Sequence, residues 1–541
     1  MIQNSKDYFR VFDASSRPGI SIDKETIMRA GSWILIFAIA MLLLSAQCSV
    51  QKESTEVRQY NFEPTGESLE NYKVPQWYED AKFGIYFHWA PFSVAAYKTE
   101  WYPYWMYSPP RIKNNRKFQD IPKHHIETWG TLDKFGYKDF IPLFKAEKWN
   151  PDEWVQLFKE AGAKYVVSAA VHHDGFAMWD SKYIAYNSKV MGPKRDVVGE
   201  FVKAARKADL KTGVSTHYGR HWAYYTFRPE YDNWDPKYEG LYGHRRGDND
   251  PPRPEDEQHW ENVMTELIDN YQPDYIFVDG GIGDGERKFK KPYFRQAFYN
   301  VLAHYYNSAR QWRKGVVLTY KREFLDPNQA VEDFERSGLN SIRLSSKWQT
   351  DDKISVNGWC YVEDTEFWPV NYLIGAMADI VSKNGNLLLN VGPRPDGTLR
   401  EVEVGTLKEI GKWLKVNGEA IYSTRPWRQF GEGTMVKISS DGKQGKSKMG
   451  PDCVRFTVKG QTLYAICFGW PEFGEFTIKS LSSKNPLSKR GIKSITMLGS
   501  DEDIQWDQTE SGLELIFPTQ APCDYAYVLK IVPKGELLFT E

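Results

Sequence analysis

Short apolar strands alternate with amphipathic helices through most of this 541-residue chain, and this alternation limits the possible folds more than any other feature. Between residues 74 and 427, segments rich in β-branched and aromatic residues repeatedly precede stretches with helical periodicity. Such a repeat is typical of parallel strands whose connecting helices cover the sheet. We therefore predict a (β/α)8-like (TIM) barrel, regular or irregular, over residues 74–427.

The short apolar runs give the expected strands of this barrel. They cover residues 83–87, 164–171, 211–216, 275–278, 315–320 and 386–391. After Trp427 the helical pattern disappears, and only strands and turns remain. We predict that residues 428–541 form a small antiparallel β-sandwich. Two domains also fit the length, since one hydrophobic core rarely serves a chain of this size.

The beginning of the chain has the features of an export signal. The apolar run Trp33–Ala46 is short for a membrane span and has the length of a signal-peptide core. The polar residues ahead of it fit such a signal poorly, whereas Met28 is followed at once by a positive charge and then by the run. We expect residues 1–48 to be a mis-called start plus a signal peptide, with Met28 as the true start. Residues 49–73 are expected to be a linker, and the mature protein to be exported.

The cysteines and the net charge indicate which ligands and partners are to be expected. Cys48 follows the apolar run and is a candidate lipid-attachment residue, although Gln47 replaces the usual small residue before it. Membrane association is expected only through such a lipid. The remaining cysteines form no CxxC pair, so neither a disulfide framework nor a thiolate metal site is predicted. The formal net charge of −1 gives no electrostatic basis for binding nucleic acid.

Polar side chains follow three of the expected strands. Asp279 follows the strand at 275–278, His172 and His173 follow the strand that ends at Val171, and His88 follows the strand at 83–87. Asp279 alone has an ordinary alternative, which is to cap the next segment or form an Asx turn. The carboxyl ends of the strands carry the active site in barrels of this kind. The convergence of the three therefore predicts a catalytic or binding site.

The chemistry of these side chains favours a sugar over a metal ion. Adjacent residues on an extended chain point in opposite directions, so His172 and His173 are not expected to bind one ion together. Neutral histidines can instead form hydrogen bonds with sugar hydroxyls. Glu100 and Trp101 place a carboxylate beside an indole, a combination that suits a polyhydroxylated ring. The alternative is a surface glutamate next to a core tryptophan, in a chain that is 15% aromatic.

Several longer motifs resemble one family of enzymes. They are AKFGIYFHW (81–89), EWY (100–102), HHDGFAMWDSKY (172–183), VSKNGNLLLNVGP (381–393) and NGEAIY (417–422). Together they resemble the α-L-fucosidases of glycoside hydrolase family 29, from about Val74 to the C-terminus.

The resemblance implies retaining, exo-acting hydrolysis of terminal α-L-fucose from fucosylated glycans, through a covalent glycosyl-enzyme and without a metal or organic cofactor. It implies that Asp279 is the nucleophile and that Trp359 faces the methyl group of fucose. The residues that it implies hold the sugar are His88, Glu100, Trp101, His172, His173 and Arg336.

The chain departs from the family where a general acid is commonly found. Family members often have Trp-Glu at that place, whereas this chain has Trp348-Gln349, and an amide cannot protonate a glycosidic oxygen. A sugar-contacting tyrosine also has no counterpart near His217. The acid must then be another carboxylate, and the candidates are Glu332, Asp333, Glu335, Asp351 and Asp352.

We predict that Glu335 is the general acid/base, because it precedes the expected sugar-contacting Arg336. Asp351 and Asp352 lie in a polar run that favours a solvated turn. Alternation along an extended strand is the objection, since it would turn Glu335 away if Arg336 faces the sugar. Two other functions stay open. One is a catalytically silent, lectin-like relative, suggested by Gln349, and the other is a glycosidase of the same fold for a related sugar.

Overall fold

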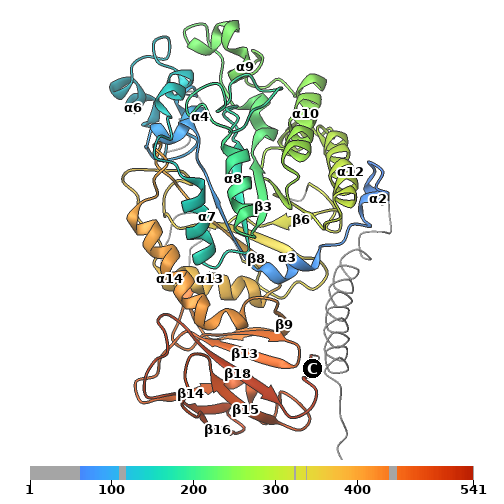
Figure 1. Ribbon diagram of the computed structural model, residues 1–541, viewed down its shortest axis with the longest axis vertical. Helices are drawn as coiled ribbons and strands as arrows, with labels where there is room; N and C mark the ends of the chain where they lie inside the picture. Colours follow the sequence, from blue (N-terminus) through green and yellow to red (C-terminus); the bar gives the residue numbers. More distant parts are fainter. Residues whose placement is uncertain (1–60, 109–116, 322–323, 337, 438–446, 540–541) are drawn as a thin grey trace, which may run out of the picture. The chain divides into compact units, whose positions relative to one another are not determined.

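The computed structural model describes residues 61–108, 117–321, 324–336, 338–437 and 447–539 (Figure 1). From Tyr60 onwards the chain forms one compact unit. The expected signal peptide, the start at Met28 and the lipid-attachment residue Cys48 lie outside the described residues. Within the described ranges no helix has both the length and the apolarity that a membrane span requires.

Eight parallel strands close into a barrel, as the alternating pattern predicts. The first strand pairs with the last from Phe83 opposite Leu387 to Phe87 opposite Val391, which completes the cylinder. The strands are β1 (Phe83–Phe87), β2 (Tyr165–Val171), β3 (Lys211–Thr216), β4 (Tyr275–Val278), β5 (Val317–Lys321), β6 (Val331–Asp333), β7 (Trp348–Lys353) and β8 (Gly385–Val391).

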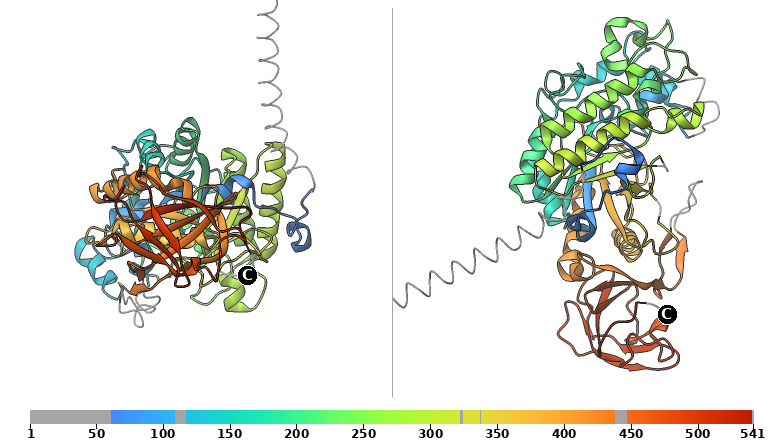
Figure 2. Two further views of the ribbon diagram at one scale, coloured as in Figure 1. Left: turned by 90° about the horizontal axis from the view of Figure 1, so that it is seen from below. Right: turned by 90° about the vertical axis from the view of Figure 1, so that its right-hand side faces the viewer.

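Long helices surround the barrel, and α10 and α12 lie side by side against it (Figure 2). Their packing includes the stacked rings of Trp260 and Phe298, 5.5 Å apart. The long helices are α7 (Pro151–Glu160), α8 (Val197–Lys207), α10 (Pro254–Tyr271), α12 (Arg295–Gln311), α13 (Val370–Ser382) and α14 (Glu401–Asn417). Shorter helices are α2 (Gly66–Leu69), α3 (Gln76–Ala81), α4 (Tyr102–Met106), α6 (Ile121–Thr128), α9 (Glu239–Tyr242) and α11 (Asp284–Phe289).

The barrel is irregular between β6 and β7, where the described residues contain no helix. Neither strand was predicted from the sequence. The prediction of a solvated turn at Asp351 and Asp352 is wrong, because these residues belong to β7 and are buried. Asp351 points into the barrel, where it accepts a hydrogen bond of 2.8 Å from the hydroxyl of Tyr86. Polar side chains are stable there because neighbouring strands supply their partners.

Gln349 lies at the centre of the barrel and is completely buried. Its side-chain oxygen accepts hydrogen bonds from the hydroxyls of Tyr78 (2.8 Å) and Tyr275 (2.9 Å), and Tyr165 adds a third at 3.3 Å. Its amide nitrogen donates to Asp333 at 2.7 Å. Gln349 thus satisfies polar groups inside the barrel.

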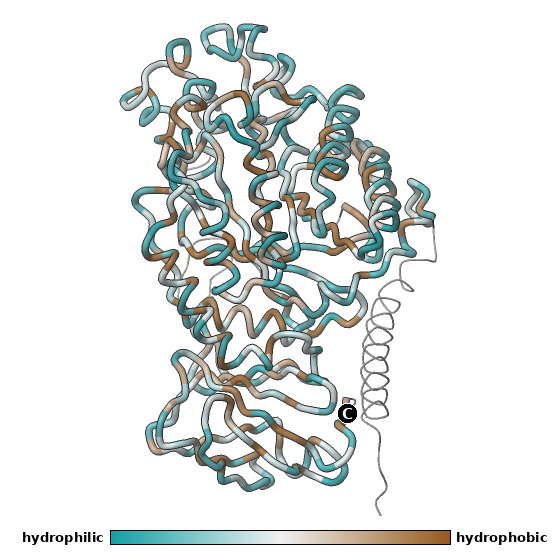
Figure 3. Tube along the Cα trace, viewed as in Figure 1, coloured by the Kyte–Doolittle hydropathy of each residue, from teal (hydrophilic) through white to brown (hydrophobic). Residues whose placement is uncertain are grey.

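The C-terminal part forms two antiparallel sheets, as its pattern of strands and turns predicts, and its first strand begins at Arg425. One has the strand order β15-β18-β13-β12-β9 and the other β14-β17-β16, while β10 and β11 form a separate hairpin. The apolar residues of β13 and β18 appear as brown segments in Figure 3. The strands are β9 (Arg425–Glu432), β10 (Met435–Lys437), β11 (Ser447–Met449), β12 (Val454–Lys459), β13 (Thr462–Cys467), β14 (Glu475–Ile478), β15 (Ile492–Met497), β16 (Gln505–Gln508), β17 (Leu513–Ile516) and β18 (Tyr527–Pro533).

Candidate active site

A pocket lies at the carboxyl ends of the barrel strands and collects most of the predicted site residues. Its lining comprises His88, Glu100, Trp101, His172, His173, His217, Arg220, Asp279, Gly280, Gly281, Asp284, Lys321, Glu335 and Trp359. The first six strands each contribute a residue at or just beyond their last position. Arg336 is the one predicted site residue that does not line it.

Asp279 occupies the floor of the pocket, and both of its carboxylate oxygens have a partner. Lys321 Nζ lies 2.7 Å from Oδ1, and His217 Nε2 lies 3.0 Å from Oδ2. The backbone N–H of Asp279 donates to the carbonyl of Thr216 at 2.9 Å, which fixes the strand end. Lys321 therefore pairs with one oxygen, and the other lies beside the imidazole of His217 without hydrogen-bond geometry.

The two glycines after Asp279 turn the chain sharply. Gly280 and Gly281 have positive φ angles of 64° and 79°. A Cβ on Gly281 would lie 2.8 Å from the backbone nitrogen of Arg220 and 2.5 Å from its Cβ. Only glycine allows these two loops to approach so closely beside the pocket.

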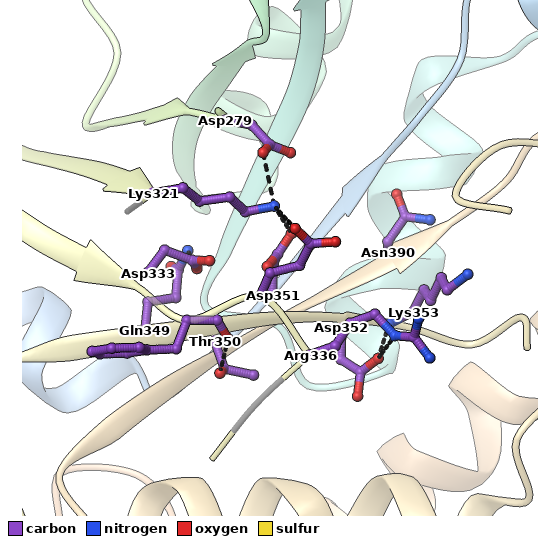
Figure 4. A network of polar contacts seen from close by, with 12 residues as sticks. Asp279, Lys321, Asp333, Arg336, Gln349, Thr350, Asp351, Asp352, Lys353 and Asn390 are labelled. Carbon is purple, nitrogen blue, oxygen red and sulfur yellow. Dashed lines mark hydrogen bonds and ion pairs between the residues drawn. The ribbon is translucent and has the colours of Figure 1, made fainter. Parts of the chain in front are cut away.

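Lys321 is the central cation of the site, as Figure 4 shows. Its ammonium lies 2.7 Å from Asp279, 3.0 Å from Asp351 and 3.4 Å from Glu335. Burial alone would lower the pKa of Lys321, but these carboxylates raise it well above the usual value. The lysine therefore stays protonated and holds the three acidic groups together.

Asp351 and Asp333 lie beneath this lysine inside the barrel. Burial, reinforced by the neighbouring Asp351, raises the pKa of Asp333 well above its usual range. Burial also raises the pKa of Asp351, whereas Lys321 lowers it. Asp351 is the carboxyl group of this pair that faces the ammonium, at 3.0 Å.

Three buried histidines from different strand ends form one wall of the pocket. His88, His172 and His217 offer ring nitrogens that all lie within 4.8 Å of one another, a geometry that could hold a metal ion. Burial, followed by the neighbouring imidazoles, lowers the pKa of His172 and of His217 well below the usual value, and burial also lowers that of His88. All three are neutral imidazoles near pH 7. Neutral rings can bind either hydroxyl groups or a metal ion.

The tautomer of His88 follows from its neighbour. Asn390 donates its amide hydrogen to the carbonyl of Trp359 at 2.6 Å, so its side-chain oxygen is the atom that lies 2.8 Å from His88 Nδ1. Nδ1 must then carry the proton, and Nε2 is left as a hydrogen-bond acceptor. An acceptor here suits a sugar hydroxyl.

Indole rings and Glu100 complete the pocket. The backbone N–H of Trp359 donates to Glu100 Oε2 at 2.8 Å, which joins two segments far apart in the sequence. The ring of Trp359 lies 5.5 Å from that of His88, and Trp101 lies 4.9 Å from His173. The pocket therefore offers both flat apolar faces and hydrogen-bonding groups.

Glu335 faces the pocket, whereas Arg336 turns away from it. Glu335 lies two residues beyond β6, is 45% exposed and contacts Lys321. Arg336 has a positive φ angle of 52° and lies against Asp352, outside the barrel, in a separate cavity (Figure 4). The two successive side chains do point in opposite directions. It is Glu335 that faces the pocket and Arg336 that faces away from it.

The distance between the two site carboxylates is limited by the lysine that they share. Since Asp279 lies 2.7 Å and Glu335 3.4 Å from Lys321 Nζ, the contacting oxygens are at most about 6 Å apart. A sugar bound between them can be attacked by one carboxylate and protonated by the other.

His217, Arg220 and Lys321 line the pocket but were not predicted. His217 directly follows β3, so the rule that selects His88 after β1 applies to it equally. Lys321 is the last residue of β5, one position beyond the strand expected at 315–320. His217 and Lys321 could have been predicted by examining the residues at the carboxyl end of every strand.

A barrel whose strand ends bring two carboxylates, neutral histidines and indoles into one pocket is typical of a glycoside hydrolase, and comparison with known proteins shows that class. The family model described as "Alpha-L-fucosidase" matches residues 49–419, and that of the alpha-L-fucosidase C-terminal domain matches residues 449–532. The chain belongs to the alpha-L-fucosidase family.

Relatives and solved structures agree with this assignment. The tissue alpha-L-fucosidase of Bos taurus is 30% identical over 531 residues, covering 93% of this chain and 98% of the relative. That of Homo sapiens is also 30% identical, over 91% of this chain and 96% of its own. The crystal structure of Thermotoga maritima alpha-fucosidase in complex with fucose has a TM-score of 0.66 and 29% identity, over 87% of this chain and all of the other.

Proposed function

We propose that this protein is a retaining, exo-acting α-L-fucosidase that removes terminal α-L-fucose from fucosylated glycans through a covalent glycosyl-enzyme. The observation that carries the proposal is the pair of carboxylates, Asp279 and Glu335, on one lysine and at most about 6 Å apart. Retaining glycosidases place their two carboxyl groups roughly 5–5.5 Å apart, whereas inverting enzymes need about 6.5–9.5 Å to admit a water molecule.

Asp279 and Glu335 have different roles in the proposed reaction. Asp279 attacks the anomeric carbon, and its bond to that carbon forms as the bond to the leaving oxygen breaks. Glu335 gives its proton to that oxygen, then takes a proton from the water that releases fucose. Lys321 pairs with one oxygen of Asp279, which limits rotation of the attacking carboxylate.

The remaining pocket residues fit the recognition of fucose. Glu100, His88, His172 and His173 are buried groups that can bind the hydroxyls of the sugar. Trp359 offers an apolar face to the methyl group. The lectin-like alternative loses its support, because Gln349, the residue that suggested it, lies inside the barrel and does not line the pocket.

The stereochemistry of the first product tests the proposal. We expect the protein to release nitrophenol from a nitrophenyl α-L-fucoside, with α-L-fucose as the first anomer seen by proton NMR before mutarotation. A first product of β configuration would contradict retention. No turnover of the fucoside, with fucose still bound, would contradict the enzymatic function, and faster cleavage of another glycoside would contradict the specificity.

We also propose that the protein is exported, with the apolar run Trp33–Ala46 as the support. N-terminal sequencing of the mature protein from fractionated cells tests this. A mature chain that begins near Cys48 is expected, and mass spectrometry of that residue distinguishes a lipid-attached form. Recovery of the chain in the cytoplasm with an intact N-terminus would contradict export.

A further inference from the structure

A wide groove adjoins the active pocket on the side of Glu335. Its volume is about 800 Å³, and Glu335 lines both the groove and the pocket. Gly283 of the groove is also adjacent in sequence to Asp284 of the pocket. The other residues that line the groove are Glu286, Arg287, Lys290, Lys291, Pro292, Arg295, Phe324, Glu332, Asp333 and Phe334.

The position of Glu335 determines what enters this groove. A general acid must lie within hydrogen-bond reach of the oxygen that it protonates, which joins fucose to the rest of the glycan. The leaving group therefore departs past Glu335, in the direction of the groove. This step rests on the proposed function of Glu335.

The acidic residues of the groove are largely neutralised. Glu286 receives two hydrogen bonds from the guanidinium of Arg295, at 2.9 and 3.0 Å. Glu332 pairs with Arg343 at 2.9 Å. Asp333 is buried inside the barrel, and Glu335 contacts Lys321 at 3.4 Å. Little negative charge is left to repel an anion.

Two lysines add positive charge to the groove and take no part in these ion pairs. Lys290 and Lys291 follow α11 and are exposed at the groove. Among the residues that the structure describes, neither forms an ion pair. Lys290 has a left-handed backbone with a φ angle of 57°, which ends the helix and sets the direction of the pair. The groove therefore presents two adjacent ammonium groups to whatever occupies it.

Aromatic rings line the same groove. Phe324 is buried, and the guanidinium of Arg295 lies 4.8 Å from the centre of its ring. The guanidinium of Arg343 lies 5.5 Å from the centre of the Phe334 ring. These rings pack against the arginine side chains and give the groove a partly apolar wall beside its charged groups.

We propose that this groove binds an anionic saccharide, so that the preferred substrate carries its fucose on an acidic oligosaccharide. The negative group is a sulfate ester or a carboxylate, and either can pair with Lys290 and Lys291. Because the groove is open, the interaction acts through exposed ion pairs and is weakened by salt.

Three substrates with the same fucosyl linkage test the proposal. One has a neutral leaving oligosaccharide, the second a sulfated one and the third a carboxylated one. Their kcat/KM values are compared in the wild type, in the double variant Lys290→Glu/Lys291→Glu, and in the control Lys489→Glu/Lys493→Glu. The control makes the same change in charge at exposed lysines of the C-terminal domain.

At low ionic strength the wild type is expected to favour at least one anionic substrate about 3- to 10-fold over the neutral one, the range that two exposed ion pairs give. This ratio should fall towards one in about 1 M salt and in Lys290→Glu/Lys291→Glu, and stay unchanged in the control. Ratios within each variant cancel any general loss of activity. Preference for the sulfated or for the carboxylated substrate identifies the anion.

Two results would overturn the proposal: equal rates on all three substrates in the wild type, or a preference that survives in Lys290→Glu/Lys291→Glu. Failure of the proposed function is a different result, namely no turnover of nitrophenyl α-L-fucoside by the wild type. The two failures are therefore distinguished by one additional assay.

Discussion

At the scale of single residues, one ammonium group organises the chemistry of this site. Lys321 contacts Asp279, Glu335 and Asp351, and the last of these is supported from below by Tyr86. The lysine keeps its own charge because three carboxylates outweigh the effect of burial on its pKa.

Replacing Asp279 by Ala or Asn is expected to lower kcat by roughly three or more orders of magnitude, because the attacking carboxylate is lost. The measurement is turnover of nitrophenyl α-L-fucoside, with circular dichroism to confirm that the variant is folded. A folded variant with near-wild-type turnover would contradict the assignment of the nucleophile.

Replacing Glu335 by Ala should slow the cleavage of natural fucosides strongly and spare nitrophenyl fucosides, because nitrophenolate leaves without a proton. Added azide should then accelerate the variant and give a fucosyl azide of retained configuration. Asp352→Ala is a suitable control, because Asp352 lies on the outer face of β7. Equal losses on both substrates, without rescue by azide, would remove Glu335 from this role.

Removal of metal ions is expected to leave activity unchanged. His88, His172 and His217 could hold an ion by geometry, but the proposed reaction uses them as neutral partners of sugar hydroxyls. Prolonged treatment with EDTA followed by the nitrophenyl fucoside assay tests this. Loss of turnover that zinc restores would show that the three histidines serve a metal.

At the scale of elements, the sequence predicts well those strands whose residues are apolar. β1, β2, β4, β5 and β8 are rich in Val, Ile, Leu, Tyr and Phe, and each was expected within a few residues of its observed bounds. The largely polar β3 was also expected at its observed bounds. β6 and β7 were missed because Val331–Asp333 is very short and Trp348–Lys353 is almost entirely polar. A polar strand is stable here only because other strands satisfy it inside the barrel, and no local pattern contains that information.

Prediction of the site residues likewise depended on whether the strand before them is apolar. Asp279, His88, His172 and His173 follow apolar strands and were found by that rule alone. Glu335 follows β6, which no pattern reveals, so its position came from a resemblance and from elimination among carboxylates. The direction of Arg336 depends on a left-handed backbone angle that its sequence does not indicate.

The turn after β4 gives a prediction at this scale. In Gly281→Ala the added Cβ would meet the backbone of Arg220 at 2.8 Å, whereas in Gly280→Ala it would meet nothing within 4 Å. Both changes strain a positive φ angle, at about 1–2 kcal/mol each. We expect Gly281→Ala to lose clearly more activity and thermal stability than Gly280→Ala. Equal effects in kcat and Tm would show that the close approach to Arg220 is unimportant.

At the scale of the whole molecule, the C-terminal sheets are fastened to the barrel by a buried ion pair. Arg455 of β12 lies 2.6 Å from Asp379 of α13, and Lys383 lies 2.7 Å from the other oxygen of that carboxylate. Arg455 and Asp379 are both largely hidden from solvent. The pair therefore links folding of the two parts without touching the active pocket.

Replacing Arg455 by Met should destabilise the protein by about 3–5 kcal/mol, because it leaves a buried carboxylate with one partner fewer. A lower Tm is expected, while kcat/KM of the folded enzyme at 25 °C stays close to that of the wild type. Lys484→Met, at an exposed ion pair, is the control and should change Tm little. An unchanged Tm in Arg455→Met would show that the pair does not hold the two parts together.

The absence of a helix from the described residues between β6 and β7 has an evolutionary consequence. Asp279 follows a strand that continues into regular barrel structure, so its place is fixed by the architecture. Glu335 instead belongs to a stretch that insertion or deletion can reshape at little energetic cost. Lineages that inherit this barrel can therefore diversify in the bonds they cut by rewriting this stretch, while the attacking residue stays where it is.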